Sequence, residues 1–425
     1  MRIRNSIKAG LAVALAALMA TSMSACASTP GGGGSSGGQI TLNALFMQQA
    51  GYSQEQIDAM IGEFTAANPN IKVNASYVAY EALHDKIVQA APAGTYDVVL
   101  MDVIWPAEFA TNGIVQDVTS RYPASWKDDM LGGAYTTAEY QGKMYGVPWG
   151  PSTKFLYYNK DMVQAVGATE ADLNTWDGVL AVAKKIKDKG LSKYPLAWSW
   201  QQAEAVICDY GQILGAFGGQ FTDDSGKLDV NNATGVQALT WMKQTLDDGL
   251  SNPASVTFLE DDVQKALAQG DTAFGLNWES TFSDLQDPSQ SKVVGKVGII
   301  PTPEGPTGAR PGVNGAMALA IGAKSAHPDE AWQLISFLTS QQEQNQYPTG
   351  WLPNWKSSYT DPTITAKAPE LFAAAQTGYA DLIQRPQVPN YNAASAALQA
   401  EIQNALLGKK SPQQALDDAV AAAGS

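Results

Sequence analysis

Aromatic side chains stand beside carboxylates and amides at several places along this 425-residue chain. Aromatic rings stack on the apolar faces of ring compounds, and carboxylates, amides and Arg hydrogen-bond to hydroxyls. Ligands of open α/β sheets bind beyond the carboxyl ends of strands, so we searched for these residue types after strand-like runs. The candidate ligand-binding residues are Gln48, Tyr80, Asp102, Trp105, Trp149, Trp200, Gln201, Glu204, Trp278, Glu279, Asn314, Trp351, Arg385 and Tyr391.

Carboxylates in such a set have a second possible use, which is catalysis. Glycoside hydrolysis needs two carboxyl groups about 5–9.5 Å apart, one of them with a raised pKa. Asp102, Glu204 and Glu279 are the candidates for that chemistry. No nucleophile-elbow motif accompanies them. Binding without catalysis is therefore the favoured interpretation, and a secreted glycoside hydrolase is the alternative.

Several candidates also have a purely structural explanation. Asp102 could cap the helix that follows it. Trp198 and Trp200 share a strand face, because they are two residues apart, and one of them could belong to the core. Trp278, in an Asn-Trp-Glu sequence, is the best candidate for stacking on a ligand. The Trp residues expected to serve packing alone are Trp126, Trp176, Trp241, Trp332 and Trp355.

Composition restricts the partners and the chemistry further. The chain has 27 Lys and Arg against 41 Asp and Glu, a net charge of −14. An acidic chain lacks the cationic surface that nucleic acids and anionic lipid headgroups attract. Two His and two Cys leave little room for a His/Cys metal site, a disulfide framework or a Cys–His catalytic pair. We expect no metal, no cofactor and no nucleic acid.

The first 38 residues are typical of an exported lipoprotein. Basic residues precede an uncharged stretch at 9–20, which is too short to span a bilayer and fits a signal peptide. Residues 23–26 read Met-Ser-Ala-Cys and resemble the bacterial lipobox, which implies diacylation of Cys26. Residues 1–25 are then the signal peptide, and the Gly- and Ser-rich residues 26–38 are a flexible tether. An ordinary signal peptide that happens to contain a Cys is the alternative.

Hydrophobic periodicity predicts alternating strands and helices in the rest of the chain. Strands are expected at 40–45, 71–77 and 97–101, with helices between them. Ser53 to Gln56 form a capping box at the start of the first helix. This order implies an α/β fold with helices on both faces of a mainly parallel sheet. Further strands are expected at 154–158, 194–200, 296–300 and 316–321, and further helices start at Thr175 and cover 235–246, 328–340 and 393–407.

Several segments together resemble one known family. Phe64 to Val73 fits the pattern F-x-x-x-x-P-x-I-x-V, and residues 97–113 fit a D-V-V stretch followed by F-A-x-x-G. Residues 142–161 carry the most specific similarity, and residues 350–353 and 385–391 resemble the closing portion. The chain from 40 to 423 is thereby similar to extracellular solute-binding proteins of ABC importers, in the carbohydrate-specific branch that includes maltose-type binding proteins.

The resemblance implies a two-lobed, periplasmic-binding-protein-like fold of type II, with a ligand cleft between the lobes and closure by a hinge. It places interlobe crossings near residues 150–153, 301–306 and 349–353. The N-terminal lobe would then comprise 39–153 and 305–350, and the C-terminal lobe 154–304 and 351–425.

The same resemblance implies a function. We expect a monomer, lipid-anchored at the extracytoplasmic face of the cell membrane, that captures an oligosaccharide and delivers it to an ABC transporter permease. A polyol or another solute on the same fold is the alternative, and a sensor role is compatible with the fold.

Overall fold

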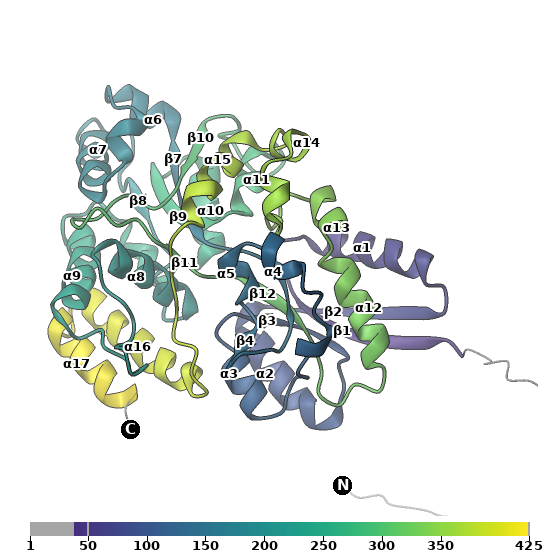
Figure 1. The fold of residues 1–425 in the computed structure, drawn as a ribbon. Helices are drawn as coiled ribbons and strands as arrows, with labels where there is room; N and C mark the ends of the chain where they lie inside the picture. Colours follow the sequence, from purple (N-terminus) through teal and green to yellow (C-terminus); the bar gives the residue numbers. More distant parts are fainter. Residues whose placement is uncertain (1–37, 49–50, 424–425) are drawn as a thin grey trace, which may run out of the picture. The chain divides into compact units, whose positions relative to one another are not determined.

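The computed structural model describes residues 38–48 and 51–423. The predicted signal peptide, Cys26 and nearly all of the tether lie outside these residues. Within them, no helix is both long enough and apolar enough to cross a membrane. Each of two lobes is built around its own β-sheet (Figure 1).

The N-terminal lobe contains a five-stranded sheet in the order β2-β1-β3-β12-β6. Strand β3 is fully buried and β1 is buried from Ala44 to Met47, because helices cover both faces of the sheet. The sheet strands are β1 (Ile40–Met47), β2 (Ile71–Val78), β3 (Val98–Asp102), β6 (Val147–Gly150) and β12 (Met317–Ile321), and β4 (Glu139–Tyr140) and β5 (Lys143–Met144) form a separate hairpin. The helices are α1 (Gln54–Ala67), α2 (Tyr80–Ala90), α3 (Pro106–Thr111), α4 (Trp126–Asp129), α5 (Gly132–Tyr135), α12 (Pro328–Leu338) and α13 (Gln341–Gln346).

The C-terminal lobe contains a four-stranded sheet in the order β10-β7-β9-β8. Alternate residues of β7 enter two separate hydrophobic cores, Leu156 and Tyr158 on one face and Phe155 and Tyr157 on the other. The strands are β7 (Lys154–Asn159), β8 (Leu196–Ala197), β9 (Phe274–Trp278) and β10 (Val297–Ile300), and β11 (Gly312–Val313) pairs with β13 (Leu382–Ile383). The helices are α6 (Lys160–Ala165), α7 (Trp176–Asp188), α8 (Glu204–Ala216), α9 (Ala233–Asp247), α10 (Glu260–Gln269), α11 (Thr281–Gln286), α14 (Pro362–Thr365), α15 (Pro369–Gly378), α16 (Tyr391–Leu406) and α17 (Pro412–Ala423).

Local sequence signals account for the helix starts. Ser53 and Gln56 form the capping box predicted for α1, and the Thr175 hydroxyl accepts a hydrogen bond from the backbone N–H of Gly178 at the start of α7. Helices α16 and α17 pack against each other and against α9, and α16 also packs against α8 (Figure 1). The C-terminal helices therefore belong to the C-terminal lobe.

The sheets are mixed, with more antiparallel pairing than the sequence predicted. Strands β1, β2 and β3 pair in parallel, as expected. Strand β12 runs antiparallel to β3 and β6, and β7 runs antiparallel to β9 and β10. Both β12 and β7 come directly after a crossing from the other lobe, and each runs in the direction opposite to the strands beside it.

The chain crosses between the lobes at three places. Residues 151–153 connect β6 to β7, and residues 314–316 connect β11 to β12. These two crossings lie side by side, because the Gly315 N–H donates to the Ser152 carbonyl oxygen at 2.9 Å. At the third, Trp351 packs in the N-terminal core and Leu352 in the C-terminal lobe.

The predicted crossing at 301–306 is wrong. The Glu304 N–H donates to the Asn174 carbonyl at 2.7 Å, and the Glu304 carbonyl accepts from the Trp176 N–H at 3.0 Å. A Cβ added at Gly305 would stand 1.9 Å from the Ala216 carbonyl oxygen, so only glycine fits there. The Pro and Gly residues permit close packing on α7 and α8 rather than a hinge, and residues 305–313 belong to the C-terminal lobe.

The strand predicted at 194–200 is also shorter than expected, since β8 covers only Leu196–Ala197. Beyond it the backbone bonds outside the sheet, with the Trp198 N–H donating to the Ser255 hydroxyl and the Trp200 N–H to the Ser255 carbonyl. The rings of Trp198 and Trp200 lie stacked, with centroids 5.4 Å apart.

Candidate functional site

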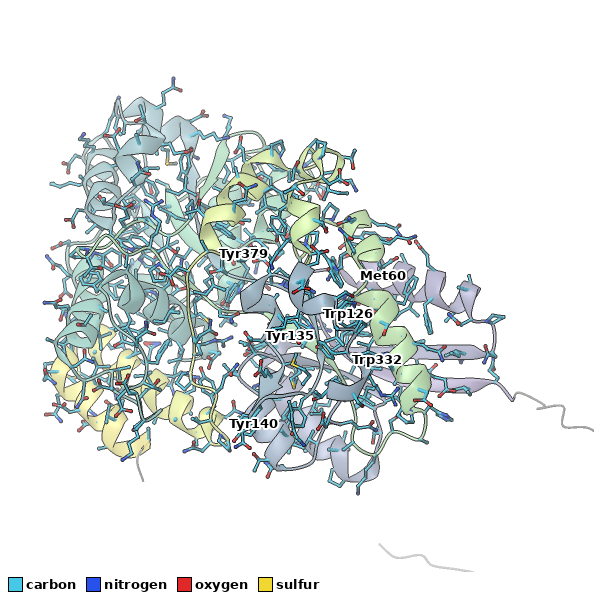
Figure 2. The ribbon with its side chains drawn as sticks, viewed as in Figure 1. Met60, Trp126, Tyr135, Tyr140, Trp332 and Tyr379 are labelled. Carbon is cyan, nitrogen blue, oxygen red and sulfur yellow. The ribbon has the colours of Figure 1, made fainter. Side chains whose placement is uncertain are left out.

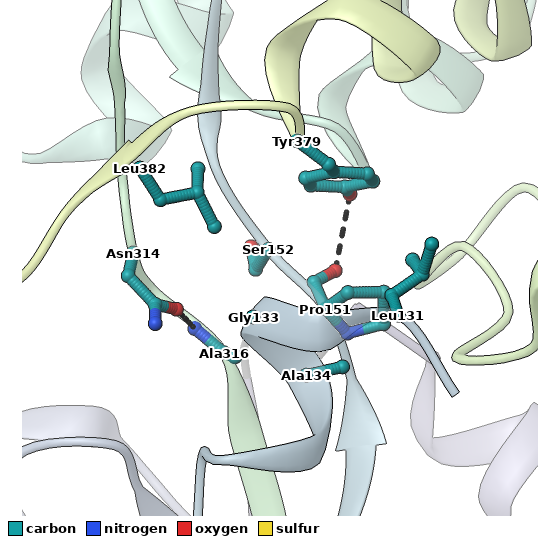
Figure 3. A pocket seen from close by; sticks show the side chains of 9 residues that line it. All are labelled: Leu131, Gly133, Ala134, Pro151, Ser152, Asn314, Ala316, Tyr379 and Leu382. Atoms are coloured by element: carbon teal, nitrogen blue, oxygen red, sulfur yellow. Dashed lines mark hydrogen bonds between the residues drawn. The ribbon is translucent and has the colours of Figure 1, made fainter. Parts of the chain in front are cut away.

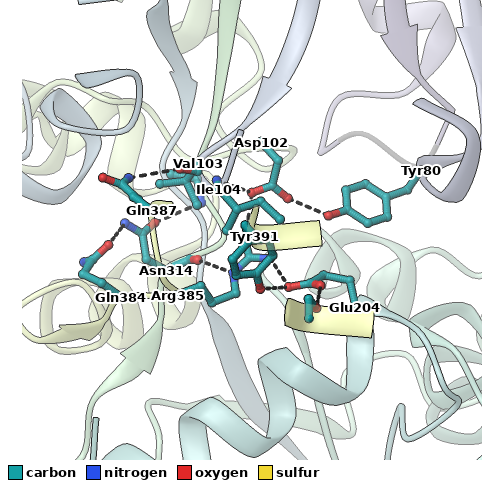
Figure 4. A network of polar contacts seen from close by, with 12 residues as sticks. Tyr80, Asp102, Val103, Ile104, Glu204, Asn314, Gln384, Arg385, Gln387 and Tyr391 are labelled. Atoms are coloured by element: carbon teal, nitrogen blue, oxygen red, sulfur yellow. Dashed lines mark hydrogen bonds and ion pairs between the residues drawn. The ribbon is translucent and has the colours of Figure 1, made fainter. Parts of the chain in front are cut away.

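Two ion pairs that share Arg385 join the two lobes (Figure 4). Arg385 follows β13. Its Nη2 donates to Asp102 Oδ1 at 2.9 Å, and its Nη1 donates to Glu204 Oε1 at 2.8 Å. Asp102 is the last residue of β3 in the N-terminal lobe, and Glu204 is the first residue of α8 in the C-terminal lobe. One guanidinium therefore holds a carboxylate from each lobe.

Neutral groups complete this interlobe network, defined as Tyr80, Asp102, Glu204, Asn314, Arg385 and Tyr391. The Tyr80 hydroxyl donates to Asp102 Oδ2 at 2.8 Å, and the Tyr391 hydroxyl donates to Glu204 Oε1. The Arg385 Nε–H donates to the Asn314 carbonyl oxygen at 3.3 Å. All six residues of the interlobe network were among the candidates, and their role in binding a ligand stays a prediction.

Burial makes each charge of the interlobe network costly unless it has a partner of opposite charge. The side chains of Arg385 and Asp102 are 2% and 3% exposed, and that of Glu204 is 12% exposed. Burial raises the pKa of the Asp102 carboxyl, and the Arg385 guanidinium opposes that shift. Removing one partner of a buried ion pair leaves an uncompensated charge, which costs more than an exposed pair contributes.

Trp105 supports the network from the N-terminal lobe. Its ring stacks on Tyr80, with centroids 6.0 Å apart and planes 17° apart, and it also contacts His84. Trp105 is 2% exposed, so in this conformation it presents almost no surface to a solute. Its observed role is to hold Tyr80 and His84 in place.

A second buried charged cluster lies in the C-terminal lobe. Lys154 Nζ donates to Asp209 Oδ1 at 2.7 Å and to the Ser199 hydroxyl at 2.8 Å, and lies 3.0 Å from Glu260 Oε1. It also lies 5.1 Å from the centroid of the Trp278 ring, within the range of a cation–π contact. Burial lowers the pKa of Lys154, but the two carboxylates raise it by more.

Trp278 connects this cluster to the second crossing. Its ring packs against Gly315, where an added Cβ would lie 2.3 Å from a ring carbon. Gly315 directly follows Asn314 of the interlobe network. Trp278 is half-buried, whereas Trp105, Trp149, Trp200 and Trp351 are buried. Among the predicted aromatic candidates it is best placed for stacking.

Glu279 contacts the first crossing. Its carboxyl is fully buried, and Oε2 accepts from the Ser152 hydroxyl at 2.9 Å and from the Thr153 N–H at 3.3 Å. Within the described residues Oε1 has no hydrogen-bond partner. Burial raises the pKa of Glu279 from 4.5 to about 8, so the carboxyl is mainly protonated at neutral pH. We interpret Glu279 as a hinge residue.

A small hollow adjoins both crossings (Figure 3). Pro151 and Ser152 line it from the first crossing, Asn314 and Ala316 from the second, and Tyr379 closes one side. Its cavity volume is about 10 Å³, room for roughly one water molecule, whereas small-molecule pockets span roughly 300–1,000 Å³. The hollow therefore belongs to the hinge rather than to a sugar-sized site.

Five other candidates lie outside the interlobe network. Trp149 is fully buried and donates from Nε1 to the Leu338 carbonyl at 3.0 Å, and Trp351 packs on it in the N-terminal core. Trp200 belongs to a core of the C-terminal lobe. The burial of these three Trp side chains corrects the expectation that they face a ligand. Gln48 is exposed after β1, and Gln201 is half-buried before α8.

Sequence reasoning missed several residues at the lobe interface. Gln387 Nε2 donates to the Val103 carbonyl at 3.0 Å, and the Asn392 side chain reaches Glu108 at 3.3 Å and His84 at 2.7 Å. Lys154 was also missed, although a charged residue at the head of an apolar strand was an available signal. Within the described residues, no cluster of His, Cys, Asp and Glu has the arrangement of a metal site.

Comparisons with known proteins agree with this architecture. The family described as bacterial extracellular solute-binding protein matches residues 50–345. A probable ABC transporter-binding protein of Deinococcus radiodurans is 28% identical over 344 residues, which covers 77% of this chain and 79% of the relative.

Two solved structures of solute-binding proteins are similar to this chain over most of its length. The maltose-bound MalE3 of T. maritima has a TM-score of 0.81 and 28% identity, covering 90% of this chain and 98% of that chain. An ABC transporter solute-binding protein of Agrobacterium radiobacter in complex with ribitol has a TM-score of 0.80 and 25% identity, covering 91% and 98%.

The fold and the interlobe site define a two-lobed solute-binding protein. The chain belongs to the bacterial extracellular solute-binding protein family. The predicted resemblance to ABC-importer binding proteins of the carbohydrate type is thereby confirmed, as is the two-lobed fold.

Proposed function

We propose that this protein captures an oligosaccharide between its two lobes and delivers it to an ABC transporter permease. The observation that carries the proposal is the interlobe network, which gathers carboxylates, hydroxyls and a guanidinium from both lobes. Hydroxyls of a bound solute both donate and accept hydrogen bonds, so they suit such a mixed set. A solute that contacts both lobes favours the closed arrangement and shifts the population toward it.

Stacking favours a ring compound over an open chain. Trp278 lies beside the second crossing and offers a half-buried ring to the C–H face of a sugar. The related MalE3 structure is maltose-bound, which supports this reading. The related structure with ribitol supports the alternative, a polyol on the same site.

The chain's three candidate catalytic carboxylates do not favour hydrolysis. Asp102 and Glu204 share the Arg385 guanidinium, and Glu279 is bonded to the first crossing. A retaining or inverting hydrolase needs one carboxyl group as an acid and another free to act as nucleophile or base. The ion pairs of Asp102 and Glu204 oppose both roles, and we propose a carrier without catalysis.

The binding test is calorimetric titration of the full chain with a panel of sugars and polyols. Cys26→Ala keeps the protein in solution, and the panel comprises mono- to tetrasaccharides, maltose among them, and ribitol. We expect one oligosaccharide to bind tightly and to be recovered intact. Trp278→Ala should weaken its binding roughly 10- to 30-fold, because removing a central stacking residue costs about 1.5–2 kcal/mol.

Trp332→Ala is the matched control for that titration. Trp332 lies in α12 and stacks on Trp126 in the N-terminal lobe, with centroids 6.1 Å apart (Figure 2). Its replacement should leave the affinity unchanged. Binding of ribitol alone would establish the polyol alternative, and recovery of a cleaved sugar would show a hydrolase.

We also propose a lipid anchor at Cys26, on the strength of the lipobox-like residues 23–26. Two acyl chains give stable membrane attachment. Cys26→Ala should therefore move the protein from the membrane fraction of cells to the soluble fraction. Cys208→Ala is the control, since Cys208 is buried in the C-terminal lobe. A Cys26→Ala protein that still sediments with membranes would contradict the anchor.

A further inference from the structure

One short segment of the C-terminal lobe bonds to the N-terminal lobe through several side chains. We call residues 384–392 the strap. It begins after β13 and ends in the first turn of α16, and both elements pack in the C-terminal lobe. Three of its side chains bond to the N-terminal lobe: Arg385 to Asp102, Gln387 to the Val103 carbonyl and Asn392 to Glu108.

Arg385 differs from the other two because it also binds the C-terminal lobe. Its Nη1–H bonds to Glu204, and its Nη2–H bonds to Asp102. The guanidinium presents its donors in a rigid fork that suits two carboxylates at once. Without a cation at this point, Asp102 and Glu204 would be two buried negative charges on facing lobes.

Each oxygen of both carboxylates accepts at least one hydrogen bond from a protein group. Asp102 Oδ2 accepts from Tyr80, and Glu204 Oε2 accepts from the Ser395 hydroxyl at 2.6 Å. Each carboxylate also receives one donor of Arg385. Protein groups alone therefore hold the lobes together at this point, without a solute.

We propose that Arg385 is an internal latch of the cleft. Its guanidinium holds Asp102 and Glu204 together across the lobe interface, and a solute that bonds to either carboxylate competes with it. The latch keeps the binding protein partly closed before a solute arrives. Opening therefore includes separation of Arg385 from one carboxylate, and the latch sets the fraction of molecules that are open.

The test measures the opening of the lobes with no solute present, so its result is independent of which solute binds. Nitroxide labels are placed at two exposed positions, Glu81→Cys in α2 and Ala396→Cys in α16. The full chain carries Cys26→Ala, which leaves the buried Cys208 as its one native thiol. Pulsed electron resonance then gives the distribution of distances between α2 and α16.

Arg385→Met should shift this distribution to longer distances, with the open population raised at least about tenfold, because truncating one partner of a buried interfacial charge pair weakens the interface strongly. Arg121→Met is the matched control, since Arg121 pairs with Asp329 at 2.7 Å entirely within the N-terminal lobe. The control should reproduce the parent distribution.

A folded Arg385→Met protein with the parent distribution would overturn the latch. Circular dichroism establishes whether the variant folds. If it does not, Glu204→Gln replaces it, because the amide keeps the shape of Glu204 and removes the charge that Arg385 holds. That variant should also populate longer distances, and an unchanged distribution there would overturn the proposal equally.

Discussion

Glu279→Gln is expected to make the protein more stable at pH 9 by about 3–5 kcal/mol, at 1.36 kcal/mol per unit of pKa shift. The folded protein raises the pKa of Glu279 from 4.5 to about 8 through burial. Between these values the folded protein holds a proton that the unfolded chain has released. The stability contributed by Glu279 is therefore complete below pH 4.5 and is lost as the pH rises through about 8.

The measurement is the free energy of unfolding by urea at several pH values from 4 to about 9. The wild-type curve should fall over this range by more than the curve of Glu279→Gln, since the Gln amide carries no charge at any of these pH values. Glu370→Gln is the control, because the Glu370 side chain is 52% exposed. Parallel curves for wild type and Glu279→Gln would contradict the buried, protonated carboxyl.

Lys154→Met should destabilise the protein by about 3–5 kcal/mol, because it removes one partner of a buried ion pair. Lys154 and Asp209 are 0% and 1% exposed, and Asp209 would be left as a buried charge without its cation. Adding Asp209→Asn should recover a large part of the loss, since the unpaired charge disappears.

Lys184→Met provides the comparison for Lys154→Met. Lys184 pairs with Asp188 on the surface of α7, and its side chain is 69% exposed. Exposed pairs contribute only about 0–1 kcal/mol. The free energy of unfolding by urea, measured for the three variants, distinguishes the buried ion pair from the exposed one. A Lys154→Met protein as stable as Lys184→Met, or a double variant less stable than Lys154→Met, would show that burial does not control this cluster.

The sequence could name the members of the interlobe network as candidates because residue type and position at strand ends follow a local rule. Asp102 ends a buried strand and Glu204 follows one, so residue type and position identified both. Their meeting with Arg385 could not be read from the sequence. Arg385 is 283 positions from Asp102, and no local pattern encodes which distant segments meet.

The aromatic candidates show where this local rule fails. Trp149 and Trp278 lie in strands and Trp200 ends the predicted strand at 194–200, yet the structure buries Trp149 and Trp200 in cores and leaves Trp278 half-exposed. A Trp at a strand end can turn toward the core or toward the lobe interface, and its neighbours in space decide between them. Gly315 packs against Trp278 and is such a neighbour, although the two residues are 37 positions apart in the sequence.

The crossing at 301–306 was predicted wrongly for a related reason. Pro and Gly content indicates irregular backbone, but it does not distinguish a mobile connection from a segment packed tightly on a helix. Gly305 is required here by its approach to Ala216. The crossing at 314–316 has no comparable local signal, because it lies between two short strands of different sheets.

The central claim is that a solute is held between the lobes by the interlobe network. A crystal structure of the protein with the sugar that titrates tests it most directly. We predict that the sugar's hydroxyls bond to Asp102 in the N-terminal lobe and to Glu204 in the C-terminal lobe, with one ring on Trp278. A sugar bound to one lobe alone, with the bonds from Arg385 to both carboxylates intact, would contradict the account.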